Sequence, residues 1–293
     1  MRFLLILALV LGFSVTAQSF PDRYVTAVVP SAPGNGNDVL ARGFTDLLSK
    51  KIGQSIIIEN KPGAGTTIGV ERAVRAPADG YTLLINSAAM VTADATTPVT
   101  YSIRDDLIPI AFLGDTQMAL VARKNLATNY SDFISKAKKN ELSAGIVGYG
   151  GVTYFSTEKF RIANDAPYLS IPYKGTQEVL VDMIGGRVDY SFLPLQSVAP
   201  LVADGKIDLI LVVTKDQPEL YVRFWAAVFI SSKADPAIIG MYYNASREVR
   251  KSAEYQKFIK SIDVIPAENM TIEQMQKLID KDLVEYRKIV QQK

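Results

Sequence analysis

Apolar segments and segments of helical periodicity alternate along this chain, and the alternation restricts the fold more than any single motif. The first round has apolar segments at 25–30, 55–59 and 81–85, separated by helical patterns at 37–51 and 66–75. Turn residues such as glycine punctuate the segments. Strands that alternate with helices at this spacing form a parallel sheet with right-handed crossovers. The sequence therefore predicts an α/β fold.

The same alternation starts again in the middle of the chain. Apolar segments at 109–113 and 118–122 form the crossing between the two rounds. Beyond the crossing, the pattern predicts strands at 142–147, 169–173, 188–193 and 207–213, and helices at 131–139, 153–162, 176–184 and 196–203. Ser131 is the expected N-cap of the first of these helices. The strand at 207–213 is a candidate for returning to the first domain.

The C-terminal third completes the organisation. It predicts a strand at 224–230 and helices at 236–250, 253–262 and from 271 to 290, the last opened by a capping box of Thr271 and Gln274. We therefore expect two α/β lobes joined by two or more strand crossings. Lobe 1 is discontinuous, with residues 18–117 and 214–293, and lobe 2 comprises residues 118–213.

Two glycine-rich loops each follow a strand and open a helix. The first reads Pro33-Gly34-Asn35-Gly36-Asn37-Asp38, and the second runs from Gly148 through Tyr149, Gly150 and Gly151 to Thr153. Backbone N–H groups at a helix start bind anions without a charged side chain. The segment 86–98, rich in Ser, Ala and Thr, shows little periodicity and is expected to be a loop facing the same crevice. The sequence thus predicts an anion held between the lobes.

The candidate ligand-binding residues lie on these loops and near them. Those of lobe 1 are Ser31, Ala32, Gly34, Asn35, Asn37, Asp38, Ser87 and Ala88, and those of lobe 2 are Tyr149, Gly150, Thr153, Tyr154, Lys174 and Pro194. Asp38 has a second interpretation, in which it caps its helix and orders the loop. Lys174 either balances the ligand charge or is an ordinary exposed lysine.

The composition excludes much chemistry. The 293 residues include no Cys and no His, so Ser-His-Asp or Cys-His catalysis and thiolate or imidazole zinc sites are impossible. No D-x-[DN]-x-[DN]-G calcium loop occurs. The formal net charge is only +2 and the basic residues are scattered, which argues against nucleic acid as a partner. We expect no metal and no cofactor.

The first 17 residues are typical of a secretory signal peptide. Arg2 precedes an apolar run at 3–13, and Val15 and Ala17 supply small residues at the −3 and −1 positions of a cleavage site. The run is short for a membrane span. The mature chain is expected to start near Gln18 and to work in the periplasm; the alternative is an uncleaved N-terminal anchor.

Five short motifs then occur in a fixed order. They are Val28-Val29-Pro30 with Pro33-Gly34 and Asp38; Glu59-Asn60-Lys61-Pro62-Gly63-Ala64-Gly65 with Ile68-Gly69; Asp79-Gly80-Tyr81-Thr82-Leu83-Leu84; Ile171-Pro172-Tyr173-Lys174-Gly175; and Gly185-Gly186-Arg187-Val188-Asp189. The set resembles the tripartite tricarboxylate transporter substrate-binding proteins, the Bug family, over about residues 24–205. The resemblance implies a two-lobed periplasmic-binding-protein fold of type II, a Venus flytrap. It also implies a receptor that closes on a small di- or tricarboxylate or related organic acid and delivers it to membrane permease subunits. We expect this receptor to be a monomer.

The chain departs from the family pattern at three places. Asn35 interrupts the glycines of the first loop, Leu193-Pro194 stands where the family commonly has an Asp–Asn pair, and the segment after Val213 is shortened. The loss of that carboxylate argues against a ligand with an amino group.

Parts of the sequence suggest two other functions. Gly34-x-Gly36 followed by Glu59 imitates a dinucleotide fingerprint, but Val39 occupies the place of the third glycine. A secreted hydrolase or isomerase would use carboxylates such as Asp38 or Asp189 as acid and base. No spaced carboxylate pair or activated nucleophile supports the enzyme, so we expect a receptor without catalysis.

Overall fold

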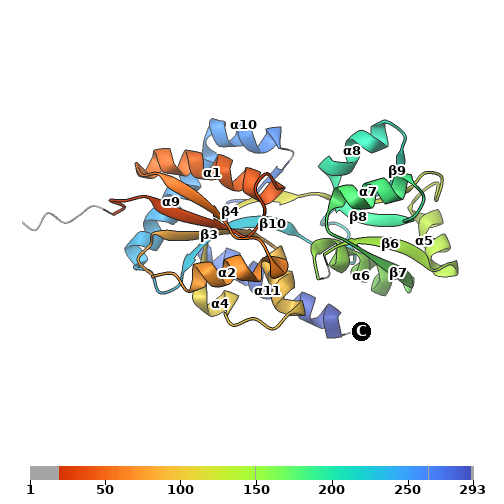
Figure 1. Ribbon diagram of the computed structural model, residues 1–293, viewed down its shortest axis with the longest axis horizontal. Helices are drawn as coiled ribbons and strands as arrows, with labels where there is room; N and C mark the ends of the chain where they lie inside the picture. Colours follow the sequence, from red (N-terminus) through yellow and green to blue (C-terminus); the bar gives the residue numbers. More distant parts are fainter. Residues whose placement is uncertain (1–19, 149, 263, 292–293) are drawn as a thin grey trace, which may run out of the picture.

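Two β-sheets organise the chain (Figure 1). The structure is a computed structural model that describes residues 20–148, 150–262 and 264–291. The first sheet has the order β11-β4-β10-β3-β1-β2, with β1 (Val25–Val29), β2 (Ile56–Asn60), β3 (Thr82–Ser87), β4 (Leu107–Thr116), β10 (Phe224–Ser231) and β11 (Ile265–Pro266). The second has the order β7-β6-β8-β5-β9, with β5 (Met118–Arg123), β6 (Leu142–Val147), β7 (Tyr168–Tyr173), β8 (Tyr190–Pro194) and β9 (Ile207–Val212). We call the half around the first sheet lobe 1 and the half around the second lobe 2.

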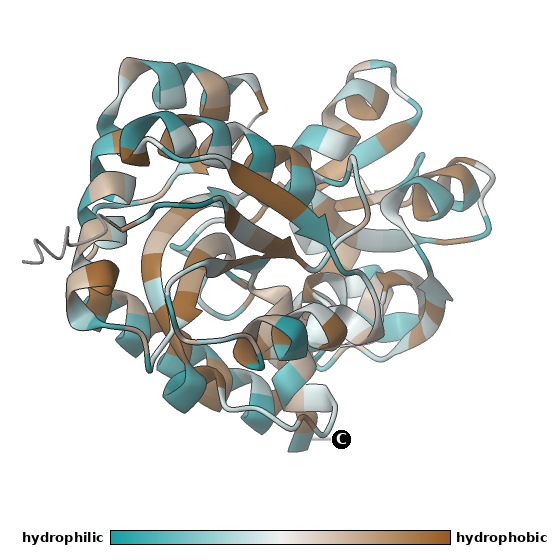
Figure 2. Ribbon diagram, turned by 60° about the vertical axis from the view of Figure 1, so that its left-hand side comes forward, coloured by the Kyte–Doolittle hydropathy of each residue, from teal (hydrophilic) through white to brown (hydrophobic). Residues whose placement is uncertain are grey.

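Helices cover both faces of each sheet. Lobe 1 carries α1 (Gly36–Ile52), the 3₁₀ turn η1 (Ala64–Thr66), α2 (Thr67–Val74), α3 (Ala89–Thr96), α4 (Ile103–Asp106), α9 (Pro236–Lys251), α10 (Ala253–Ser261) and α11 (Ile272–Gln291). Lobe 2 carries α5 (Tyr130–Lys139), α6 (Val152–Asn164), α7 (Thr176–Ile184) and α8 (Leu195–Ala203). Figure 1 places α1 and α10 on one side of the first sheet and α2 and α11 on the other. Figure 2 shows the apolar strands enclosed by helices with polar outer surfaces.

Strand β1 shows why the first apolar segment is nearly continuous. Val25, Ala27 and Val29 pack with α1 and α9 on one face, and Val28 packs with α2 and α3 on the other. A strand that is buried on both faces has no polar positions to alternate with. β1 pairs in parallel with both β2 and β3, as predicted.

Three sequence predictions about secondary structure were wrong. The segment 86–98 contains α3, whose consecutive residues 90–93 are all buried, so no polar face marks the helix in the sequence. In the described part of the chain, strand β9 pairs with β5 alone and stays in the second sheet; β10 is the strand that returns to the first. The N-cap of α5 is Asn129, whose side chain accepts from the Asp132 N–H, and not Ser131. The capping box of Thr271 and Gln274 is confirmed in both directions.

The two sheets exchange the chain twice. Gln117 alone separates β4 from β5, and residues 213–223 connect β9 to β10. The division into lobes at residues 117 and 213 stays a prediction, and the expected signal peptide at 1–17 lies outside the described residues. Within the described part of the chain, no helix has both the length and the apolar character needed to cross a bilayer.

Candidate functional site

The carboxyl ends of three parallel strands of lobe 1 meet at one edge of the first sheet. β1 leads into the loop of residues 30–35, β2 leads into η1, and β3 leads into α3. Helix α1 begins at this edge with Asn35 as its N-cap, and the Asn35 side chain makes no capping hydrogen bond. The N–H groups of its first turn are therefore left to another acceptor. This edge is where ligands bind in open α/β sheets.

Asp38 holds the first loop in shape. Its Oδ2 accepts from the Gly34 N–H at 2.8 Å and from Arg42 Nε at 2.9 Å. Its Oδ1 accepts from Arg42 Nη2 at 3.0 Å and from Asn60 Nδ2 at 2.8 Å. Asn60 also donates to the carbonyl of Ser31 at 3.0 Å. Burial disfavours the charged form, but these hydrogen bonds outweigh burial and hold the pKa of Asp38 at about 2. Both oxygens are occupied, so we interpret Asp38 as the organiser of the loop.

Four buried polar atoms at this edge lack a hydrogen-bond partner among the described residues. They are Ser31 Oγ, Asn37 Oδ1, Thr66 Oγ1 and Asn86 Nδ2. Asn37 reaches β3, where its Nδ2 donates to the Ile85 carbonyl at 3.3 Å. Unsatisfied buried polar groups are rare in folded proteins, and a ligand or ordered water commonly explains them. Ser31 and Asn37 are among the ligand-binding residues predicted from the sequence, whereas Thr66 and Asn86 are not.

The two missed residues differ in the signal they left. Asn86 directly follows the predicted strand at 81–85, and a polar residue at the carboxyl end of a strand is itself a signal of a binding site. Thr66 has φ +88°, a left-handed conformation that is a genuine outlier for a β-branched residue. Nothing in its residue type predicts that backbone.

Ser87 and Ala88 are less available than their position in the sequence suggested. The Ala88 N–H donates to the Trp225 carbonyl at 2.9 Å, and its side chain is fully buried. The Ser87 hydroxyl accepts from the Ala89 N–H at 3.3 Å. Ala32, Gly34 and Asn35 are exposed on the first loop.

The second loop is tied together by its own residues. The Thr153 hydroxyl accepts from the Val147 N–H at 2.9 Å and donates to the Val147 carbonyl at 3.2 Å. Gly151 is the N-cap of α6 and has no side chain that could cap the helix. The first N–H groups of α6, like those of α1, therefore donate no hydrogen bond to an N-cap side chain. Tyr154 is buried with its ring edge-to-face against Phe155. Tyr149 lies outside the described residues.

Gly150 brings the second loop against lobe 1. It has φ +76°, and a Cβ built on it would lie 2.5 Å from Thr96 Oγ1, in the last turn of α3. The loop of lobe 2 therefore touches the helix that leaves β3. The two lobes are thus in contact at the second glycine-rich loop, next to the candidate site.

The contacts that the structure shows for the remaining two candidates lie within lobe 2. Lys174 is exposed, and its backbone N–H donates to Glu178 Oε2 at 3.1 Å. Pro194 ends β8, opposite Met118 in the ladder with β5, and Leu193 beside it is fully buried. The binding role of all fourteen candidates stays a prediction.

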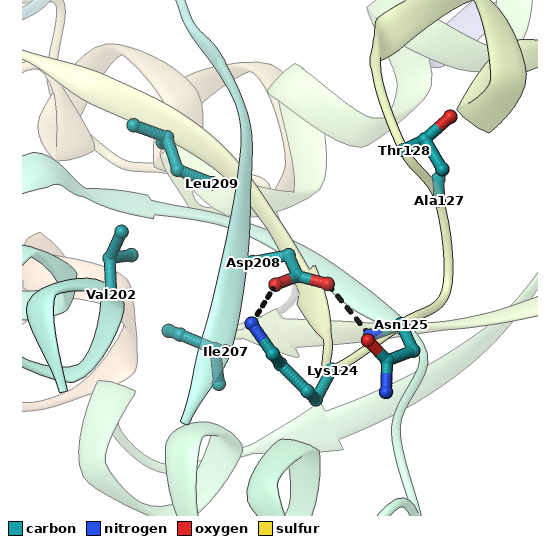
Figure 3. Close-up of a pocket in the computed structure, with 8 residues that line it drawn as sticks. All are labelled: Lys124, Asn125, Ala127, Thr128, Val202, Ile207, Asp208 and Leu209. Carbon is teal, nitrogen blue, oxygen red and sulfur yellow. Dashed lines mark hydrogen bonds and ion pairs between the residues drawn. The ribbon is translucent and has the colours of Figure 1, made fainter. Parts of the chain in front are cut away.

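Two surface hollows are lined by residues outside the two glycine-rich loops. One of about 510 Å³ lies beside β9, where Asp208 accepts from Lys124 Nζ at 2.8 Å and from the Asn125 N–H at 2.7 Å (Figure 3). The other, of about 570 Å³, lies between residues 97–105 and α11. The Asp208 carboxylate in this hollow is already paired with Lys124 and the Asn125 N–H (Figure 3), so we assign that hollow no function.

Neither carboxylate of the alternative enzyme is free to act as an acid or base. Asp38 is fully hydrogen-bonded, as described above. Burial opposes ionisation of Asp189, but the hydrogen bonds from Arg123 and Ser143 outweigh it and lower the pKa of its carboxyl. The residues that the structure describes contain no group of three or more acidic side chains able to hold a metal ion.

Known proteins are similar to this chain in sequence and in fold. Residues 40–293 match the family model described as the tripartite tricarboxylate transporter family receptor. The chain is 28% identical over 246 residues to Protein BugT of Bordetella pertussis, which covers 77% of this chain and 76% of that protein. A structure of an R. palustris protein with adipate has a TM-score of 0.79 and 25% identity, covering 93% of this chain and 97% of that one. The periplasmic binding protein BugD has a TM-score of 0.78 at 23% identity, covering 93% and 98%. The predicted two-lobed, type II periplasmic-binding-protein fold is confirmed.

Proposed function

This chain belongs to the tripartite tricarboxylate transporter family of receptors, and we propose that it captures a small carboxylate between its two lobes. The ligand is a di- or tricarboxylate or a related organic acid, and the receptor delivers it to the permease subunits of a tripartite tricarboxylate-type transporter. The N-terminal 17 residues act as a secretory signal in this proposal, and the receptor works in the periplasm as a monomer. No metal or cofactor takes part.

One observation carries the proposal. The loops that open α1 and α6 both end in helix starts without a side-chain cap, and the second loop contacts α3 of lobe 1 through Gly150. Helix N-termini stabilise an anion through their N–H groups and dipole. The unpartnered polar atoms of Ser31 and Asn37 supply further hydrogen bonds at the same edge. The R. palustris neighbour with adipate makes a dicarboxylate the first ligand to try.

Binding without turnover is the first expected result. Adipate should raise the melting temperature of the protein in a concentration-dependent way, because a ligand that binds only the folded state stabilises it. Hexane-1,6-diol, which has the same carbon chain without carboxylates, should leave it unchanged. A panel of dicarboxylates extends the search if adipate itself fails. Formation of a product from any of them, or no response to the whole panel, would contradict the receptor.

A matched pair of variants tests the charge at the second loop. A side chain at Gly150 would collide with Thr96, so Gly150→Asp would mix a steric effect with the effect of charge. Gly148 has φ +69° and open space around a built Cβ, and Asn and Asp are the residues that best tolerate this conformation. We expect Gly148→Asp to bind adipate about three- to fivefold more weakly than Gly148→Asn at low salt. Calorimetry measures both, and equal affinities would place the anion elsewhere.

A further inference from the structure

Helix α6, which follows the glycine-rich loop of lobe 2, also packs against lobe 1. At its start, Gly150 lies against Thr96 of lobe 1. One turn further, the ring of Phe155 packs on Tyr286 of α11, with ring centroids 4.7 Å apart. Lys159 follows one more turn along. These three positions span roughly 14 Å at 1.5 Å per residue. A helix of lobe 2 therefore lies along lobe 1 for more than two turns.

Lys159 makes the polar contact of this interface. Its ammonium pairs with Glu285 of α11 and donates to the Tyr221 carbonyl at 2.8 Å. The Lys159 side chain is only 10% exposed, while that of Glu285 is 36% exposed. Tyr221 belongs to the segment that connects β9 to β10. A single lysine of lobe 2 thus binds both the C-terminal helix and the returning chain.

The returning chain is itself fixed to lobe 1. Arg223 forms a bidentate ion pair with Asp115 at the end of β4, with both side chains about one-sixth exposed. Leu220 and Val222 are buried in the core beside it. Residues 220–223 therefore stay with lobe 1 when lobe 2 rotates. Such a rotation must slide α6 along α11 or separate the two helices. The Lys159 contact lies directly on that path.

We propose that Lys159 is a positioning residue, an interlobe tether that holds the first turn of α6 against lobe 1 and so keeps the ligand loops facing each other. The inference rests on the proposed function, because it assumes that the ligand lies between these loops. In this role Lys159 acts through the packing of α6 on lobe 1 and not through contact with the ligand. Without the tether, a smaller fraction of molecules has the competent lobe arrangement, and the apparent affinity falls by that fraction.

The test measures the lobe arrangement without ligand. The chain has no Cys, so Lys257→Cys on α10 and Gln177→Cys on α7 introduce two exposed labelling sites, one in each lobe. Spin labels at these two sites report the distance between the lobes by pulsed electron paramagnetic resonance. We expect Lys159→Met to shift or broaden the distance distribution and to weaken adipate binding about tenfold, a typical coupling between a distant residue and a site.

Two further variants separate a tether from a general loss of stability. Lys124→Met removes a lysine whose ion pair with Asp208 lies within lobe 2, so it should change neither distance nor affinity. Glu285→Gln keeps an acceptor oxygen for Lys159 and should act in the same direction but more weakly. Combined with Lys159→Met, it should add nothing, because the two residues share one interaction.

The outcomes are distinguishable. A wild-type protein that binds no carboxylate overturns the proposed function, while the distance measurement still reports on the tether. A wild type that binds, with Lys159→Met unchanged in distance and affinity, overturns the tether alone. Tighter binding by Lys159→Met also overturns it, since the contact would then oppose the competent arrangement.

Discussion

Asp38→Asn is expected to lower the free energy of unfolding by about 2 kcal/mol and to weaken carboxylate binding about tenfold. The Asp38 carboxylate accepts four hydrogen bonds, from Gly34, Asn60 and twice from Arg42. An asparagine amide would turn an N–H₂ group toward one of these donors. The loop that carries Ser31 and leads to Asn37 at the start of α1 would then have to be ordered by the ligand. Urea unfolding and calorimetry measure the two effects.

The pH dependence gives this prediction its sign. The pKa of Asp38 in the folded protein, about 2, lies below the ordinary value of 3.8. A lowered pKa means that the charged form stabilises the fold above pH 4 and that this contribution disappears as the pH falls toward 2. The difference between Asp38→Asn and the wild type should shrink over that range. Asp46→Asn, on the exposed side of the same helix, is the matched control and should leave the stability at neutral pH nearly unchanged. A pH-independent difference would contradict the role of the charge.

Asp282→Asn should have the opposite effect on stability. Asp282 lies on α11 with 6% of its surface exposed, and its Oδ2 accepts from the indole Nε1 of Trp225 at 2.9 Å. Burial raises the pKa of its carboxyl to about 6, and the indole hydrogen bond offsets only part of that effect. The ionised carboxylate therefore destabilises the folded protein at neutral pH. We expect the asparagine variant, which still accepts from Trp225, to be more stable by about 2–3 kcal/mol at pH 7.5.

The stability difference between Asp282→Asn and the wild type at low pH tests this explanation. A raised pKa in the folded state means that the stabilising contribution is complete below pH 4 and is lost as the pH rises through 6. The advantage of Asp282→Asn should thus vanish at pH 4 and be constant above pH 7. Asp280→Asn, on the same helix, breaks the partly exposed ion pair with Arg104 and should be neutral or slightly destabilising. Thermal melts from pH 4 to 8 decide, and an Asp282→Asn variant that is less stable at pH 7.5 refutes the prediction.

The sequence predicted those features that depend on local pattern. The strand at 25–30 and the helix at 37–51 appear as β1 and α1 within a residue or two, because periodicity and the Gly53 stop signal are local. Helix α3 was not predicted, because residues 90–93 are all buried and leave no polar face whose periodicity would mark a helix. The return of the chain through β10 instead of β9 depends on pairing between distant segments, which one sequence does not display.

The candidate site also combines features that depend on local sequence with features that depend on contacts between distant residues. The two glycine loops were visible as turn chemistry between strand and helix. The network that fixes Asp38 joins residues 22 positions apart, and the contact between Gly150 and Thr96 joins residues 54 positions apart. Lys159 gives no signal in the sequence, because an exposed lysine and a buried tether have the same side chain. Only the packing of α6 on α11 separates the two.

The place of β10 in the first sheet also determines when that sheet can form. β10 lies between β3 and β4, so β1, β2 and β3 keep an open edge until residues 224–231 have been synthesised. The strands of the second sheet all lie within residues 118–212 and are complete earlier. The long loop closure between β4 and β10 makes the six-stranded sheet the later and slower one to assemble. A chain released before residue 224 would carry an unpaired, apolar strand edge.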